Sequence, residues 1–172
     1  KVIPASVTFV DIAGLVAGAS KGEGLGNQFL SHIRSCDAII QVVRGFSDEN
    51  VLRSDSSREP SYDIEVINTE LVLADMQTVE KHFPKLEKEA RANPKLKPAL
   101  DALVQTKELL DQGKPIFTDS ELRTKNSELL PHLQLLTMKP IMYLFNIDDN
   151  ALQGATLQKE LADLVYPAPA VF

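Results

Sequence analysis

Short, continuously apolar runs near the two ends of the chain predict strands. They occupy residues 7–10, 38–43 and 141–145, and a further run begins at 168. Such runs are typical of parallel strands buried on both faces, so we expect no solvent-exposed face on 38–43. Predicted helices at 27–35 and 157–164 separate the strands, and Phe29, Leu30 and Ile33 mark the inward face of the first helix. This alternation predicts an α/β fold with a mostly parallel sheet.

The middle of the chain, from about residue 63 to 136, has the period of helices. Apolar residues recur there at intervals of three and four, first at Val72, Met76, Val79, Phe83 and Leu86, and then at Leu96, Leu100, Leu103 and Leu110. The dipeptide of Asn93 and Pro94 interrupts the series. We therefore predict an antiparallel, coiled-coil-like helical hairpin.

Local signals mark the ends of these helices. Pro84 lies within the first helix and is expected to kink it or end it early, and Gly113 is expected to cap the second. Thr118 and Glu121 match a capping box that would start a third helix, and the polar residues 47–62 predict a loop. The chain then divides into an α/β domain of residues 1–63 and 139–172 and a helical insertion of residues 64–138.

The composition is that of a globular protein. Of 172 residues, 44% are hydrophobic and 24% are charged, and the net charge of −6 gives no overall basic field for nucleic acid. The single Cys36 excludes an internal disulfide and favours a reducing compartment, and no apolar run reaches membrane-spanning length. We expect a cytoplasmic protein with no membrane partner. The chain begins at Lys1 rather than at methionine, so we also expect a piece of a longer protein.

The first candidate site follows the run at 7–10. Asp11 and Gly14 form a D-x-x-G element at the predicted strand end. A carboxylate there can hold a water bound to Mg²⁺, and the glycine amide can donate to a γ-phosphate. The alternative is an ordinary turn after a strand. Five of the eight glycines lie at 14–26, and this favours a segment with two arrangements, as in a switch. The candidate switch residues are Asp11, Gly14, Leu15, Gly18, Gly22, Gly24 and Gly26.

A second candidate site follows the run at 141–145. Asn146 can brace a purine ring, and the carboxylate of Asp149 can accept hydrogen bonds from guanine. A turn rich in Asn and Asp would explain the same residues. Because open α/β sheets bind ligands at the carboxyl edge of their strands, the two sites together favour nucleotide binding through Gly14, Asn146 and Asp149.

The two sites and the segment between them resemble a known family. Residues 9–29, from Phe9 to Phe29, and residues 63–71 are similar to the Obg-like branch of P-loop NTPases, and within it to YchF, the Obg-like ATPase. The resemblance covers nearly the whole chain. It implies a partial Ras-like P-loop NTPase domain with an inserted helical hairpin. It also implies a ribosome-associated enzyme that hydrolyses ATP or GTP with Mg²⁺, held through water by Asp11.

The chain departs from the family pattern at several places. It contains no G-x-x-x-x-G-K-[ST] loop for the α- and β-phosphates, so we expect this chain alone to be inactive. Asp149 stands where the family has glutamate, and Ile147 stands where GTPases have lysine. Arg53 replaces a histidine that the family associates with hydrolysis. Leu15 replaces the water-orienting glutamine of Ras-type enzymes, which implies slow intrinsic turnover.

Three functions remain open at this point. The first is an ATPase of the YchF type, and the second is a GTP-preferring relative, favoured by Asp149. The third is an interaction module whose helical arm binds RNA or the ribosome while the nucleotide site does not function. The arm carries the only notable basic cluster, made of Lys81, Lys85, Lys88, Arg91, Lys95 and Lys97.

The absent phosphate loop also has an architectural consequence. In a Ras-like sheet, the strand before that loop lies between the strands at 7–10 and 38–43. We therefore predict a gap about 10 Å wide between these two runs, rather than a continuous ladder. Phe9 and Ile40 should then be unusually exposed.

Overall fold

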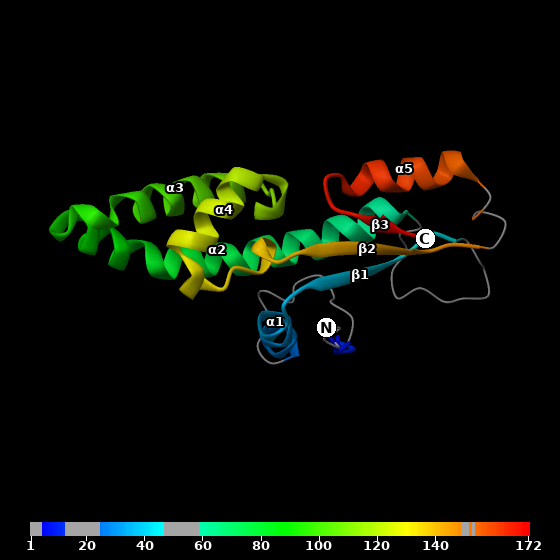
Figure 1. The fold of residues 1–172 in the computed structure, drawn as a ribbon, viewed down its shortest axis with the longest axis horizontal. Coiled ribbons are helices and arrows are strands. Elements are labelled where there is room, and N and C mark those ends of the chain that lie inside the picture. Colours follow the sequence, from blue (N-terminus) through cyan, green and yellow to red (C-terminus); the bar gives the residue numbers. More distant parts are fainter. Residues whose placement is uncertain (1–4, 13–24, 47–58, 149–151, 153) are drawn as a thin grey trace, which may run out of the picture.

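The computed structural model describes residues 5–12, 25–46, 59–148, 152 and 154–172. In these parts of the chain a small sheet stands beside a long helical arm (Figure 1). The sheet has the order β1-β2-β3, with β1 at Ile39–Arg44, β2 at Ile141–Asn146 and β3 at Ala170–Val171. Both strand pairs are parallel, as predicted, and the register runs from Ile39 opposite Ile141 to Arg44 opposite Asn146.

Helices cover one face of this sheet. The inward side chains of β1 and β2, including Val43, Tyr143 and Phe145, pack against Ile64 of α2 (Pro60–Ala92) and Leu161 of α5 (Ala155–Val165). Burial of this apolar surface is the main driving force for joining the sheet to the two helices.

On the opposite face of the sheet the side chains are exposed and no described helix covers them, and this corrects the prediction for 38–43. The outward side chains of β1 alternate with the buried ones, and Ile40 and Val42 are 45% and 66% exposed. Met142 and Leu144 of β2 lie beside them and are each 36% exposed. Continuous apolar character does not reveal which face is covered, because the covering helices come from elsewhere in the chain.

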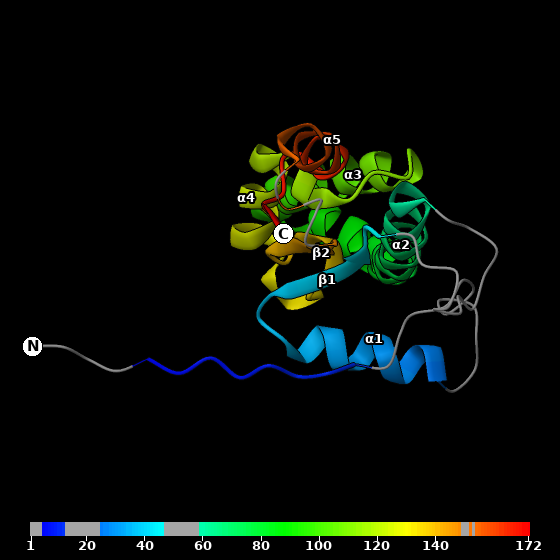
Figure 2. The same ribbon diagram turned by 90° about the vertical axis from the view of Figure 1, so that its right-hand side faces the viewer.

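The run at 7–10 does not form a strand, which is a second correction. Residues 5–12 are described without helix or strand, and they run alongside α1 (Leu25–Ser35) (Figure 2). Without a neighbouring strand to pair its backbone, an apolar run has no ladder to join. No ladder joins 7–10 to β1, as predicted, and Phe9 is 78% exposed. The predicted gap between two strands presupposed a strand at 7–10, so that part of the prediction is wrong.

The helical hairpin is confirmed. Helix α2 is followed by η1 (Pro94–Leu96) and α3 (Lys97–Asp111), and the two long helices pack together along Val72, Val79, Leu103 and Leu110. Gly113 adopts φ of +73° just after α3, a left-handed conformation that suits glycine at a helix end. The hairpin therefore forms where the spacing of apolar residues and the breakers predict it.

Helix α2 begins earlier than predicted and does not end at Pro84, and it stops just before the predicted break at Asn93 and Pro94. It begins at Pro60, inside the predicted loop, and it continues through Pro84 to Ala92. Proline at the first position of a helix is favourable, and the exposed side of α2 tolerates a missing backbone donor at Pro84. At about 1.5 Å per residue, this helix is about 50 Å long and extends from the sheet to the tip of the arm.

The rest of the arm returns the chain to the sheet. It comprises η2 (Ile116–Thr118), α4 (Ser120–Leu129), η3 (Pro131–Leu133) and η4 (Leu136–Met138). Helix α4 confirms the predicted third helix, but its cap is Asp119 rather than Thr118. The Asp119 carboxylate accepts a hydrogen bond from the Leu122 amide at 2.9 Å, and its charge is favourable at a helix N-terminus.

Candidate functional site

The carboxyl edge of the sheet carries the second candidate site. Asn146 is the last residue of β2, its side chain is exposed, and it pairs in register with Arg44 at the end of β1. Because β1 and β2 are parallel, both strands deliver their terminal residues to this edge. Asp149 lies outside the described residues, so the pair of Asn146 and Asp149 stays a prediction.

Gly45 allows the chain to pass close to Asn146, and none of the sequence motifs above includes it. Its amide donates to the Asn146 carbonyl at 2.8 Å, which extends the pairing one residue past β1. A Cβ at this position would stand 2.7 Å from Cγ2 of Ile147 and 3.3 Å from the Asn146 carbonyl oxygen. A larger residue at Gly45 would therefore push the two strand ends apart. In the sequence, this close approach is indicated only by the presence of a glycine directly after the strand.

Arg44 and Phe46 add a second feature to this edge. The Arg44 Nε donates to the Phe46 carbonyl at 3.2 Å, and the guanidinium carbon lies 4.4 Å from the centre of the Phe46 ring. This cation–π contact turns the Arg44 side chain back over the end of its own strand. Arg44 and Asn146 thus end the two neighbouring strands opposite each other at this edge.

The first candidate site is only partly described. Asp11 is exposed, as a carboxylate that meets a hydrated ion must be. Gly14, Leu15, Gly18, Gly22 and Gly24 lie outside the described residues. The backbone of Gly26 belongs to α1. No described contact brings Asp11 to Asn146, so their convergence on one nucleotide stays a prediction.

Ile12 attaches the start of the D-x-x-G element to the body of the protein. Its side chain is half-buried against a cluster that includes Leu30 and Ile33 of α1 and Leu71 of α2. The predicted inward face of α1 is thereby confirmed. Asp11 is consequently next to the place where α1 meets the helical arm.

A polar joint, made of hydrogen bonds around Asp75, Arg34 and Lys139, holds together α1, α2 and the segment just before β2. Asp75 of α2 is fully buried, and its carboxylate accepts hydrogen bonds from the Leu136 amide at 2.7 Å and the Thr137 amide at 2.8 Å. The Thr137 hydroxyl also donates to it at 2.7 Å. Burial raises the pKa of Asp75 above its ordinary value, against these hydrogen bonds, which lower it. Asp75 therefore binds η4 to the middle of the arm.

Two cations complete this joint from the other side. Arg34, near the end of α1, donates to the Thr78 hydroxyl of α2 at 3.2 Å. The Lys139 ammonium donates to the backbone carbonyls of Arg34, at 3.0 Å, and of Cys36. A cation at the end of α1 is favourable because its last carbonyls lack partners within the helix. Helix α1 is thus hydrogen-bonded both to Thr78 of the arm and to Lys139, which lies two residues before β2.

The described residues place limits on metals and membranes. Within residues 5–12, 25–46, 59–148, 152 and 154–172, no three His, Cys, Asp or Glu side chains form a group that could hold a metal ion. A single exposed carboxylate at Asp11 still fits Mg²⁺, which commonly takes one or two carboxylates together with substrate phosphates and water. None of the described helices is long and apolar enough to cross a membrane.

Comparison with known families now defines the class of protein. A model of the family described as 50S ribosome-binding GTPase matches residues 2–146, which includes the D-x-x-G element, the whole arm and the end of β2. This span covers most of the chain, and the α/β fold described above agrees with it.

Individual relatives narrow the class. The chain is 42% identical over 165 residues to the ribosome-binding ATPase YchF of Bacillus subtilis, covering 95% of this chain and 45% of that protein. It is 43% identical over 150 residues to the Obg-like ATPase 1 of Rattus norvegicus, covering 86% and 38%. The structure of the Schizosaccharomyces pombe YchF GTPase superposes with a TM-score of 0.66 at 31% identity, covering 88% of this chain and 43% of that one. The chain spans less than half the length of these relatives. It belongs to the 50S ribosome-binding GTPase family and, within it, to the YchF and Obg-like ATPase branch.

Proposed function

We propose that this chain is the central part of a longer nucleotide-hydrolysing switch protein that binds ATP, with GTP as the alternative. The observation that carries the proposal is the carboxyl edge of the sheet, where the exposed Asn146 follows a parallel strand and Gly45 keeps the neighbouring strand end close. Open α/β sheets bind nucleotides at this edge. The relatives named as ATPases support the choice of ATP, while Asp149 is the residue that favours GTP.

The residues divide into three roles in this proposal. Asn146 and Asp149 contact the base. The Gly14 amide meets the γ-phosphate, and Asp11 holds Mg²⁺ through a water molecule. The remaining switch residues, Leu15, Gly18, Gly22, Gly24 and Gly26, rearrange with the nucleotide state. The ion would supply charge neutralisation on the phosphates, and the chain's own Asp11 would orient one of its waters. Leu15 can neither donate nor accept a hydrogen bond, so intrinsic hydrolysis is slow.

The helical arm is the part of the chain that we assign to ribosome contact. Its tip carries exposed lysines, and the relatives' names include ribosome binding. The domain boundaries at 63/64 and 138/139 belong to this assignment, with the α/β part binding nucleotide and residues 64–138 forming the arm. A cytoplasmic location fits both roles.

Equilibrium titration of labelled ATP and GTP tests the proposal in the full-length protein. We expect tighter binding of ATP than of GTP. Asn146→Ala should weaken both at least about tenfold, the loss expected for one or two hydrogen bonds to a base. Asn93→Ala is the matched control at the far end of the arm and should leave both affinities unchanged. A preference for GTP of tenfold or more would reject the assignment to ATP, and an unchanged affinity in Asn146→Ala would reject the candidate edge.

A further inference from the structure

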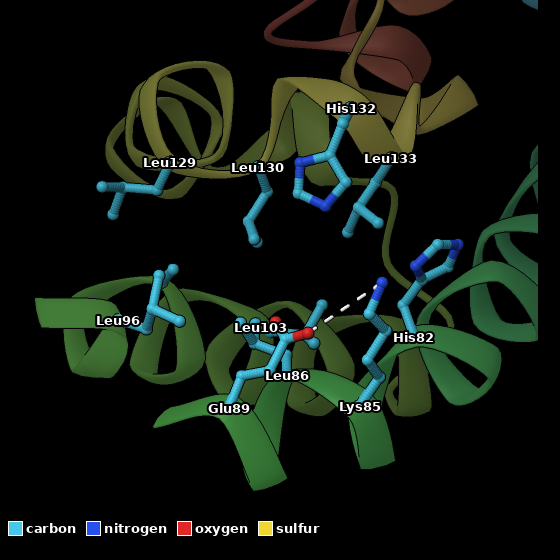
Figure 3. A pocket seen from close by; sticks show the side chains of 11 residues that line it. His82, Lys85, Leu86, Glu89, Leu96, Leu103, Leu129, Leu130, His132 and Leu133 are labelled. Atoms are coloured by element: carbon cyan, nitrogen blue, oxygen red, sulfur yellow. Dashed lines mark ion pairs between the residues drawn. The ribbon is translucent and has the colours of Figure 1, made fainter. Parts of the chain in front are cut away.

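An apolar hollow opens on the helical arm, away from the sheet. It lies between α2, α3 and the corner where α4 meets η3, and it has a volume of about 210 Å³ (Figure 3). Its floor is made by Leu103, Leu130 and Leu133, which are 0%, 1% and 3% exposed. The hollow has room for several water molecules against a wall that offers them few hydrogen bonds. Replacing that water with an apolar side chain is favourable.

The rim of the hollow combines one apolar side chain with basic and titratable ones. Leu129 stands at the edge and is 38% exposed. His132 of η3 and His82 of α2 meet edge to face, with ring centres 6.2 Å apart. On the α2 side, Lys85 and Glu89 form an exposed ion pair at 4.0 Å, which contributes little to stability and is easily rearranged (Figure 3). A side chain that enters the hollow would therefore contact Leu129 at the edge, with the Lys85 ammonium beside it.

The stretch 81–97 beside the hollow carries six Lys or Arg residues against Glu87 and Glu89, in a chain whose net charge is −6. The exposed Lys81, Lys88, Lys95 and Lys97 lie on the same stretch of α2, η1 and α3, and none of them forms an ion pair with another described residue. Charge complementarity therefore points to an acidic partner. The apolar floor favours a protein over RNA, because phosphates would pair with the lysines but leave the hollow filled with water.

We propose that this hollow and its lysines dock an acidic amphipathic helix of a partner protein. A leucine-sized side chain fills the hollow, and carboxylates on the adjacent turns of that helix meet Lys85 and the lysines beyond it. Helices that present an apolar residue on successive turns bind to grooves in this way. The inference rests on the partner contact proposed above for the arm, which it narrows to a protein helix. It is independent of nucleotide chemistry, so its failure would leave the proposed ATPase function intact.

Fluorescence anisotropy with the full chain tests this proposal. The probe is a fluorescein-labelled synthetic helix of about 18 residues, with leucines on one face and glutamates elsewhere. We expect a Kd below about 100 µM for a single anchored side chain with ionic support. A peptide with serines in place of the leucines, and one with lysines in place of the glutamates, should each bind at least about tenfold more weakly. A labelled single-stranded RNA of similar length is the fourth probe.

Variants assign the binding to the hollow. Leu129→Asp should weaken binding of the acidic leucine peptide at least about tenfold, and Lys85→Glu about threefold or more. Lys159→Glu makes the same charge change on an exposed lysine of α5 and should stay within about twofold. His132→Glu, at another exposed rim position, is the second test if Leu129→Asp fails to fold. Far-UV circular dichroism and thermal unfolding check the fold of each variant.

Four results would overturn the proposal. The first is no detectable binding of the acidic leucine peptide. The second is equal binding of the serine peptide, which would show attraction by charge alone. The third is binding that neither Leu129→Asp nor His132→Glu weakens. The fourth is RNA binding that is tighter than peptide binding and insensitive to changes at the hollow, which would identify the tip as a phosphate-binding surface.

Discussion

Replacement of Asp75 by alanine should strongly destabilise the protein, because Asp75 is the fully buried acceptor that joins the arm to η4. The change removes the acceptor of two backbone amides, on Leu136 and Thr137, and of the Thr137 hydroxyl. A buried donor left without an acceptor costs about 1–3 kcal/mol. The hydroxyl can rotate toward another acceptor, whereas the two amides cannot. The expected loss in the free energy of unfolding is therefore about 3–5 kcal/mol.

Urea denaturation followed by circular dichroism measures this loss. For a chain of this size it corresponds to a fall in Tm of about 10–15 °C. Asp101→Ala, at an exposed aspartate on α3, is the matched control and should change the free energy of unfolding by less than about 0.5 kcal/mol. A loss below about 1 kcal/mol in Asp75→Ala would refute the role of the joint.

The pH dependence of stability tests the state of the same carboxyl. Burial raises the pKa of Asp75 above its ordinary value of 3.8, so the folded protein binds this proton more tightly than the unfolded chain does. Protonated Asp75 stabilises the folded protein fully at pH values below the pKa of this group in the unfolded chain. That stabilisation is lost as the pH rises through the higher pKa of Asp75 in the folded protein. Relative to Asp75→Asn, which cannot titrate, the wild-type protein should lose stability as pH rises from about 4 and then level off. A relative gain in stability over that range would contradict the direction of the shift.

Two further pairs of variants test the packing. Val43→Ala, at a buried position of β1, should lower the free energy of unfolding by about 1.5–3 kcal/mol. The neighbouring Val42→Ala, at an exposed position, should change it by less than about 0.5 kcal/mol, as measured by thermal unfolding. Equal effects would mean that the outer face of the sheet is covered. Asn126→Ala removes the buried amide that donates to the Thr106 hydroxyl at 2.7 Å, although that hydroxyl keeps its bond to the Ala102 carbonyl at 2.8 Å. The loss should be about 1–3 kcal/mol, against less than about 0.5 kcal/mol for the exposed Ser127→Ala. If Asn126→Ala loses no more stability than Ser127→Ala, the hydrogen bond between Asn126 and Thr106 does not stabilise the arm.

Local signals in the sequence predicted the arm well. Its helices depend on the spacing of apolar residues and on breakers such as Pro94 and Gly113, which act within a few residues of themselves. The position of the third helix was also predicted, although its cap is Asp119. A charged carboxylate competes better than a hydroxyl for the amides at a helix start, and the motif alone does not rank the two.

Features that depend on distant partners were not predictable. Asp75 is one acidic residue among many in the arm, and its hydrogen-bond partners lie 61 and 62 residues later in the chain. The run at 7–10 has the composition of a strand, but a strand requires a neighbour to pair with. Which face of β1 is exposed depends on where α2 and α5 lie, and strand composition does not encode that. For the candidate site, the sequence identified Asn146 and missed Gly45, whose importance depends on its distance to Ile147.

Phosphate release from ATP by the full-length protein tests the central claim most directly. The account predicts slow, steady release that falls at least about tenfold in Asp11→Ala, since the carboxylate that orients the Mg²⁺-bound water is lost. It also predicts no release above buffer from the 172-residue chain alone, which has no G-x-x-x-x-G-K-[ST] loop. Undiminished release in Asp11→Ala, or release by this chain alone that disappears in the same variant, would contradict it.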